Sequence, residues 1–154
     1  MDLARNLKIE SVSRLNPTPA WHVAPHQSIA EAVALMRDKK VGCVLVCIDR
    51  RVVGIFTERD LTRRVLAPNK PLTAPVAECM TPDPVCVHPK DSIGSAILKM
   101  IEGGYRHLPV VNDGKPQGIL SVKRIVHYLV EHFPATIHNL PPSPMFLQPK
   151  REGA

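Results

Sequence analysis

Apolar residues in the first half of the chain follow two periods, one typical of a helix and one of buried strands. Four of them recur at i, i+3, i+4 and i+7, which places them on one face of a helix: Ile29, Ala32, Val33 and Met36. Ser28 and Glu31 have the spacing of a capping box at the start of this helix. The elements expected in this half are strands at Trp21–Val23, Val44–Ile48 and Val52–Phe56, the helix that follows Ser28, and a second helix at Arg59–Leu66.

The whole pattern occurs a second time, 64 residues further along the chain. Pro17–Leu66 aligns with Thr81–Val130 over fifty positions without an insertion, and ten of the pairs are identical. Ser95 replaces Glu31, so only half of the capping box is repeated. The second set of elements is expected at Val85–Val87, in the helix that follows Ser92, and at Leu108–Val111, Gln117–Leu120 and Lys123–His132.

A single copy of about 50 residues buries too little surface to be stable alone. We therefore expect an α+β fold in which two β-α-β-β-α repeats pack sheet to sheet with pseudo-twofold symmetry, so that any cleft on the axis comes as two related clefts. The expected divisions are an N-terminal segment (1–16), repeat one (17–67), a linker (68–80), repeat two (81–132) and a Pro-rich C-terminal tail (133–154).

The segments outside the repeats carry weaker signals. Residues 1–16 are expected to form a short helix that packs on the module or on a partner chain. Pro134 is expected to end the last helix. The tail beyond Pro134 is expected to be poorly ordered or extended. Its apolar residues would also suit a segment that packs across a neighbouring molecule; these residues are Ile137, Leu140, Met145, Phe146 and Leu147.

Charge and composition narrow the classes of function. The net charge is +6, but Lys and Arg are scattered among acids and aromatic residues make up only 4% of the chain, which gives little for base stacking. A solvated surface or a site for a small anion explains the charge better than nucleic-acid binding, which stays as an alternative. No apolar run approaches the roughly 18 residues of a membrane span, and the N-terminus lacks the apolar core of a signal peptide. We expect a soluble, cytoplasmic protein without membrane association.

Four cysteines invite a metal interpretation, but their spacing does not support it. Neither a CxxC pair nor the spacing of a zinc site occurs, so we expect buried free thiols and no metal: Cys43, Cys47, Cys79 and Cys86. The chain also lacks the GxSxG, HExxH and P-loop motifs. We therefore expect no enzymatic activity and no cofactor.

Three phrases carry a resemblance to a known family: GIFTERDL (54–61), CMTPDPVCV (79–87) and GGYRHLPVV (103–111). In this order and spacing they resemble a tandem pair of CBS (cystathionine β-synthase) domains, a Bateman module. The resemblance covers about Pro17 to His132. It implies a stand-alone regulatory or sensor module that binds an adenine nucleotide (AMP, ADP or ATP, with S-adenosylmethionine less favoured) in one inter-repeat cleft. It also implies a homodimer that transmits occupancy to an unidentified effector protein.

The resemblance also assigns residues to the first cleft. Thr57 and Asp60 of repeat one would hold the ribose, with Arg59 as a weaker candidate. Repeat two would supply backbone to the base and donors to the phosphates, and its residues are Thr81, Val85, Cys86, Arg106 and His107. A carboxylate suits vicinal hydroxyls because it only accepts hydrogen bonds, and arginine offers phosphate a fixed fork of donors.

The second cleft does not keep this chemistry. Ser121 is acceptable, but Arg124 stands in place of Asp60 and cannot accept a hydrogen bond. The remaining counterparts lack the expected donors: Pro17, Trp21, His22, Gly42 and Cys43. We expect one nucleotide per chain, with the second cleft either empty or, through Arg124 and His22, suited to a free anion.

Simpler interpretations stay open beside this one. Thr57 and Asp60 also have the spacing of a helix cap, and a cap does not exclude a role in binding. Arg106 and His107 alone would be an ordinary pair at the start of a strand. The main alternative function is a ligand-free dimeric interaction or scaffold module.

Overall fold

The computed structural model describes residues 2–138, and its elements repeat along the chain as the sequence does. The helix α2 (Ile29–Lys39) and the strands β2 (Cys43–Ile48) and β3 (Arg51–Thr57) recur, each shifted by 64 residues, as α4 (Ile93–Gly103), β5 (His107–Asn112) and β6 (Lys115–Ser121). The other elements of the first half are α1 (Leu3–Ile9), the 3-10 helix η1 (Val12–Leu15), β1 (His22–Val23), α3 (Glu58–Asp60) and the π-helix η2 (Leu61–Leu66). Those of the second half are the 3-10 helix η3 (Val76–Glu78), β4 (Thr81–Pro82), α5 (Val122–His132) and α6 (Pro134–His138).

The helix starts follow the capping signals. In repeat one, the Ser28 side chain accepts from the N–H of Glu31, and the Glu31 carboxylate accepts from the N–H of Ser28. In repeat two, Ser92 accepts from the N–H of Ser95, but Ser95 returns no bond. The half-repeated capping box predicted from the sequence is therefore confirmed.

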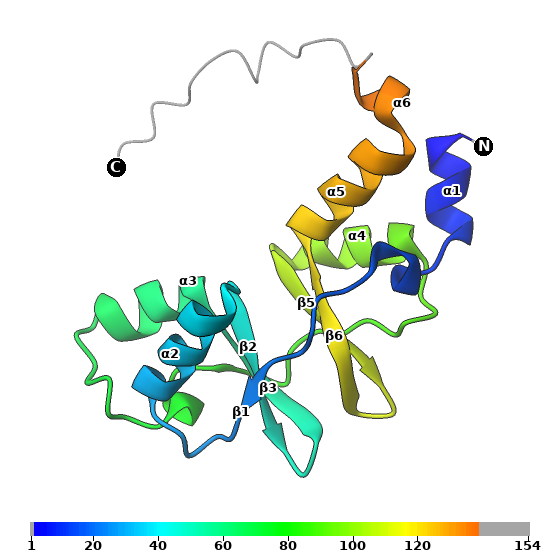
Figure 1. Cartoon of the computed structure of the whole chain (residues 1–154). Coiled ribbons are helices and arrows are strands. Elements are labelled where there is room, and N and C mark those ends of the chain that lie inside the picture. Colours follow the sequence, from blue (N-terminus) through cyan, green and yellow to red (C-terminus); the bar gives the residue numbers. More distant parts are fainter. Residues whose placement is uncertain (1, 139–154) are drawn as a thin grey trace.

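Each repeat packs its helices on one face of its own sheet, and the two sheets meet on their other faces (Figure 1). Along β2, Val44 and Val46 face the helices of repeat one, whereas Leu45 alternates to the opposite face. There it joins Ile55 and, from the other repeat, Ile119 in one buried cluster. The predicted sheet-to-sheet packing of two α+β repeats is confirmed.

The segment that enters each repeat is hydrogen-bonded to the sheet of the other repeat. β4, at the start of repeat two, pairs antiparallel with β3, so the sheet of repeat one has the order β1-β2-β3-β4. At the start of repeat one, the N–H and C=O of Thr18 bond the C=O and N–H of Ile119 in β6. This exchange ties the two repeats together through their backbones.

One predicted strand is wrong. Over Val85–Val87, only Val87 is bridged, through a parallel contact with Val110. Asp83 has a φ of 45°, in the left-handed region, and Pro84 has no N–H to donate. These two residues stop the strand that begins at Thr81 and prevent a regular strand after it.

The segments outside the repeats are partly structured. The predicted N-terminal helix is confirmed as α1, which packs on α4, with Leu7 beside Gly94. The linker contributes Val76 and Cys79 to the buried core of repeat one. α5 ends before Pro134, and α6 starts at that proline and includes Ile137. The other apolar tail residues, Leu140 and those after it, lie outside the described residues.

β3 and its counterpart β6 each carry a glycine at the point where the entry segment of the other repeat lies close to the strand: Gly54 in β3 and Gly118 in β6. A Cβ on Gly118 would lie 2.9 Å from both the Cβ of Pro17 and the carbonyl oxygen of Thr18, which is backbone. A Cβ on Gly54 would overlap the Met80 sulfur, which lies at the mobile end of a side chain. Gly118→Ala should therefore lower the free energy of unfolding by about 1–3 kcal/mol, and Gly54→Ala by less. Urea unfolding measures both, and an equal loss would contradict this account.

Candidate ligand-binding site

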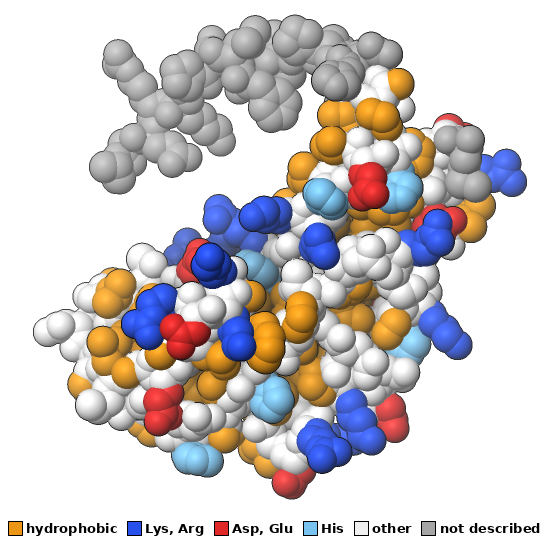
Figure 2. Space-filling model, viewed as in Figure 1, with side chains coloured by type: hydrophobic (Ala, Val, Ile, Leu, Met, Phe, Trp, Pro, Cys, Tyr) orange, Lys and Arg blue, Asp and Glu red, His pale blue; other side chains and the backbone are white. Residues whose placement is uncertain are grey.

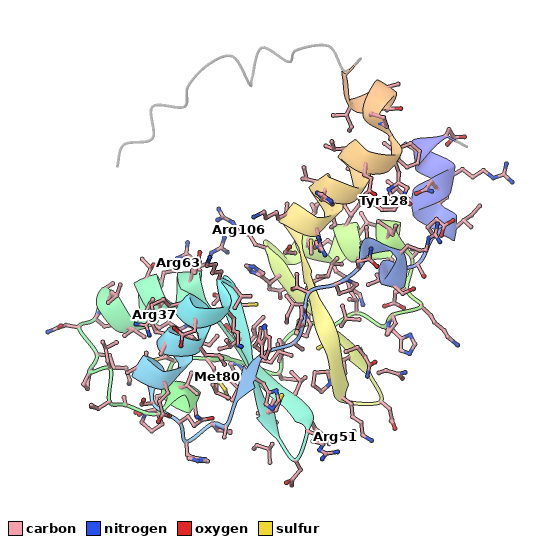
Figure 3. All side chains as sticks on the ribbon, in the orientation of Figure 1. Arg37, Arg51, Arg63, Met80, Arg106 and Tyr128 are labelled. Atoms are coloured by element: carbon pink, nitrogen blue, oxygen red, sulfur yellow. The ribbon has the colours of Figure 1, made fainter. Side chains whose placement is uncertain are left out.

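A cavity of about 410 Å3 lies between the two repeats. Repeat one lines it with the end of β3 and with α3 and η2, and repeat two lines it with the segment from Thr81 and with the turn before β5. Figure 3 shows Arg63 and Arg106 at this junction, one from each repeat. The lining residues are Ile55, Thr57, Glu58, Arg59, Asp60, Arg63, Arg64, Thr81, Pro82, Asp83, Pro84, Val85, Gly103, Gly104, Tyr105, Arg106 and His107.

Asp60 is the buried charge of this cavity, with only 6% of its surface exposed. Its Oδ2 accepts from the N–H (3.0 Å) and hydroxyl (3.1 Å) of Thr57, and the Thr57 hydroxyl oxygen accepts from the Asp60 N–H (3.2 Å). Its Oδ1 accepts from the Thr81 hydroxyl at 3.2 Å and lies 3.6 Å from the Arg64 Nε. The carboxylate thus caps α3 and also bonds the entry segment of repeat two.

The capping interpretation of Thr57 and Asp60 is confirmed. Comparison with repeat two shows that the capping hydroxyl is common to both repeats, whereas the carboxylate is not. Ser121 caps α5 by accepting from the N–H of Arg124 at 3.2 Å, as Thr57 does for Asp60. The return bond from the side chain is missing in repeat two because arginine has no acceptor. The hydroxyl is therefore part of the repeated scaffold, and the buried carboxylate is not.

Four arginines line the same cavity. Arg64 donates to the Met80 carbonyl oxygen at 2.7 Å, and Arg59 donates to the Gly104 carbonyl oxygen of repeat two at 3.1 Å. Within residues 2–138, the side chain of neither Arg63 nor Arg106 makes a hydrogen bond or an ion pair, and both residues are exposed. Figure 2 shows Lys and Arg side chains grouped along the upper edge of the junction between the two halves. This arrangement gives an anion-attracting wall opposite a buried acceptor.

His107 lies where the two repeats touch. Its ring is close enough to Gly42 that a Cβ there would be 3.2 Å from the ring atoms Cε1 and Nε2. Burial lowers the pKa of His107 below its ordinary value of 6.5; Glu58 opposes this shift and Arg106 adds to it. The ring is therefore neutral at neutral pH, and it gains a proton at a lower pH than an exposed histidine does.

Seven of the eight residues predicted for the first cleft line the cavity, whatever their role in binding: Thr57, Arg59, Asp60, Thr81, Val85, Arg106 and His107. Cys86 does not line it, and its thiol donates to the Pro84 carbonyl oxygen. Sequence reasoning missed Glu58, Arg63, Arg64, Asp83 and Tyr105, which complete the polar wall. The helical spacing from Asp60 gave a signal for Arg64, whereas nothing indicated the π-helix.

The counterpart residues of the second cleft are arranged differently. Arg124 donates its Nε to the Asn16 carbonyl oxygen at 2.9 Å, so its side chain is held by the entry segment of repeat one. It lines a separate cavity of about 480 Å3 with residues of η1 and α5. Pro17, Trp21, His22, Gly42 and Cys43 do not line that cavity.

The cysteines are free thiols. Cys43 and Cys47 lie in the buried cluster between the sheets, on one face of β2. Cys79 is buried in repeat one, and Cys86 is half-buried. Burial is the main cause that raises the pKa of Cys43 to about 12, and the negative charge of Glu58 adds to it. Burial also raises the pKa of the other three thiols, so all four stay protonated at neutral pH.

A CBS domain family model matches this chain twice, over residues 12–67 and 76–131. An uncharacterized 17.7 kDa protein of Acidianus ambivalens is 37% identical over 123 residues, which are 78% of this chain and 73% of that protein. The CBS domain-containing protein YhcV of Bacillus subtilis is 31% identical over 114 residues, 74% of this chain and 81% of YhcV. The chain spans 19% of the Arabidopsis thaliana protein CBSCBSPB3, with 34% identity over 107 residues, 68% of this chain.

Solved structures share the fold. An uncharacterized conserved protein from Pyrococcus horikoshii superposes with a TM-score of 0.73 at 28% identity, covering 93% of this chain and 100% of that one. CBSX2, solved in complex with AMP, has a TM-score of 0.67 at 29% identity, covering 79% of this chain and 96% of that one. A CBS domain protein from Pyrobaculum aerophilum, complexed with AMP, has a TM-score of 0.71 at 25% identity, covering 79% and 99%.

The burial of His107 predicts how stability depends on pH. Because its pKa is lowered in the folded state, the unfolded chain binds a proton at this residue more readily as the pH falls below 6.5. The contribution of His107 to the free energy of unfolding should therefore be complete above 6.5 and decline as the pH falls toward the lowered pKa. Urea unfolding of wild type and His107→Gln at about pH 7.5 and about pH 5.5 measures this. An equal acid loss in the two proteins would rule the assignment out.

Proposed function

The chain belongs to the CBS-domain family, and we propose that it is a regulatory module that binds an adenine nucleotide in the cavity between its repeats. The observation that carries this proposal is the pairing of a buried carboxylate, Asp60, with exposed guanidinium groups of both repeats in one cavity. A nucleoside phosphate has the matching parts, which are ribose hydroxyls that donate and phosphates that accept. The AMP complexes of two structural relatives support the same ligand class.

The bonds of Asp60 limit how it would hold a ribose. Oδ2 already accepts two bonds from Thr57, whereas Oδ1 accepts one from Thr81 and has Arg64 at the longer distance of 3.6 Å. A carboxylate oxygen has two lone pairs, so Oδ1 keeps one acceptor direction for a ribose hydroxyl. In this proposal Asp60 takes one hydroxyl rather than two, and Thr57 and Thr81 offer oxygens to the second. The phosphates lie toward Arg106 and His107.

A nucleotide in this position would contact both repeats. It would therefore stabilise the arrangement in which the repeats are held together, relative to arrangements in which they separate. In our proposal this shift in population is the signal, and an effector protein reads it. The catalytic alternative has no support beyond the presence of polar residues, because the family match and the relatives name no catalytic domain.

Calorimetric titration with AMP, ADP and ATP tests the proposal. Asp60→Ala should weaken AMP binding by at least about tenfold because it removes a charged acceptor for the ribose. Arg124→Ala, at the matching position of repeat two, should leave affinity within about twofold, because Arg124 bonds Asn16 outside the cavity. Thermal unfolding of both variants checks that they fold. Loss of binding in Arg124→Ala alone would show that the ligand occupies the second cleft.

We further propose that the chain forms a homodimer through the helices of repeat two. Figure 2 shows hydrophobic side chains gathered over α5 and α6. Val122, Val126 and Val130 recur every four residues along α5 and are each 43–52% exposed, and on α4 Ile101 is 70% exposed and Leu98 57%. A contiguous exposed apolar face of this kind is typical of a protein–protein interface. Three of the five corresponding positions of repeat one are polar, since Arg37, Glu58 and Thr62 stand where Ile101, Val122 and Val126 do; the other two are Ala34 and Leu66.

The second copy is the occupant that the spacing of the valines favours. If two α5 helices pair antiparallel about a twofold axis at Val126, then Val122 meets Val130 of the other copy. The apolar face is thus complementary to itself along the helix.

The dimer has a direct test in the molar mass measured by light scattering. Wild type should have twice the mass of the chain. Val126→Glu should be monomeric, since it places two carboxylates at the axis, and Thr62→Glu, at the matching position of repeat one, should stay dimeric. A monomeric wild type, or a dimeric Val126→Glu variant, would contradict the proposed interface.

A further inference from the structure

Three arginines besides Arg64 line the cavity, which is more positive charge than the ribose and first phosphate of the proposed nucleotide would require. Arg59 and Arg63 lie four residues apart at the start of one helix, and both line the cavity. Like charges at this spacing repel each other and destabilise the helix. Arg106 lines the cavity from repeat two, so the lining carries a third positive charge, and Figure 3 labels Arg63 and Arg106 at the junction of the two repeats. Repulsion of this kind is relieved when an anion lies between the guanidinium groups.

The carboxylates of the cavity do not compensate for these charges. Asp60 is bonded to Thr57 and Thr81, with Arg64 as its nearest cation. Asp83 lies close enough to Cys86 to influence its pKa, and Glu58 lies beside Gly42 and His107. Within residues 2–138, Arg63 and Arg106 bond no carboxylate. Arg59 has one bond, to Gly104, and its guanidinium carries further donors.

The backbone at Arg63 is unusual as well. The helix changes from α to π at Leu61, and the N–H groups of Ala67 and Lys70 bond carbonyls five residues earlier. The matching helix α5 is α-helical throughout, with Lys123 and His127 at the positions of Arg59 and Arg63. π-Helical turns are rare and occur mostly at functional sites. The π-helix and the arginine pair therefore mark the same place in repeat one and are absent from α5.

We propose that Arg59, Arg63 and Arg106 form a clamp for the phosphates beyond the first, so that the cavity selects nucleoside di- and triphosphates over the monophosphate. The inference rests on the proposed function, because the adenosine part is assigned to the Asp60 end. Each added phosphate brings negative charge and oxygens that suit the arginine fork. Sulfonium ligands are disfavoured by the same charges. Because the clamp draws on both repeats, a triphosphate joins them more firmly than AMP does.

The test compares affinities for ATP, AMP and inorganic tripolyphosphate by calorimetry, without divalent cations. Wild type should bind ATP at least about tenfold more tightly than AMP, as expected for one additional charge-assisted bond. Arg63→Gln and Arg106→Gln should each bring the ratio of the two affinities toward one, with Arg63→Gln leaving AMP affinity within about twofold. Arg37→Gln, an exposed arginine of α2 outside the cavity, should change neither affinity (Figure 3).

The outcomes separate the clamp from the proposed function. If wild type binds AMP as tightly as ATP, or if Arg63→Gln weakens both equally, the clamp is wrong while nucleotide binding stands. If tripolyphosphate binds and Arg63→Gln abolishes it, but no nucleotide binds, then the clamp stands and the adenine-nucleotide proposal is wrong. If no probe binds, both are wrong. All variants are at exposed positions, and melting temperatures confirm that they fold.

Discussion

The structure depends on one constraint: the first segment of each repeat is hydrogen-bonded to the sheet of the other repeat. β4 extends the sheet of repeat one, and Thr18 bonds Ile119 in repeat two. These bonds hold the two entry segments against β3 of repeat one and β6 of repeat two. They also require close backbone approach, which explains why Gly54 and Gly118 recur in the repeat. The sheet of each repeat is hydrogen-bonded to the entry segment of the other repeat. The cavity lies where one of these entry segments brings Thr81 beside Asp60.

A symmetric scaffold therefore carries an asymmetric site. The cap hydroxyls, the bulge after Val46 and Val110, and the bonds from Glu58 to Gly42 and from Val122 to Arg106 occur in both halves. The differences lie in side chains that the scaffold does not need. Arg124 stands in repeat two at the position of Asp60. In each half an arginine also donates to the carbonyl oxygen just before the entry segment: Arg64 to Met80, and Arg124 to Asn16. Both halves thus use an arginine to hold the entry segment, but only repeat one has a carboxylate, Asp60, at this position of its helix.

Most of the fold could be predicted from the sequence because the repeat supplies the same evidence twice. The helices and hairpins follow from apolar periodicity and from caps that both copies share. The strand predicted at Val85–Val87 is wrong because apolar periodicity takes no account of the left-handed backbone at Asp83 or of the missing N–H of Pro84. Seven residues that line the cavity could be predicted because they lie in the phrases that resemble the family. Arg63 could not, because it lies outside those phrases in the π-helix. Tyr105 lies within one of them but was not predicted, because the course of the turn before β5 decides that it lines the cavity.

The central claim is that one cavity, at Asp60, holds the nucleotide. The most direct measurement is a crystal structure of the protein grown with ATP. The account predicts one nucleotide per chain, with a ribose hydroxyl within hydrogen-bond distance of Asp60 Oδ1 and phosphates beside Arg106 and Arg63. A nucleotide bound beside Arg124, or a cavity at Asp60 that stays without ligand while solution binding is demonstrated, would contradict it.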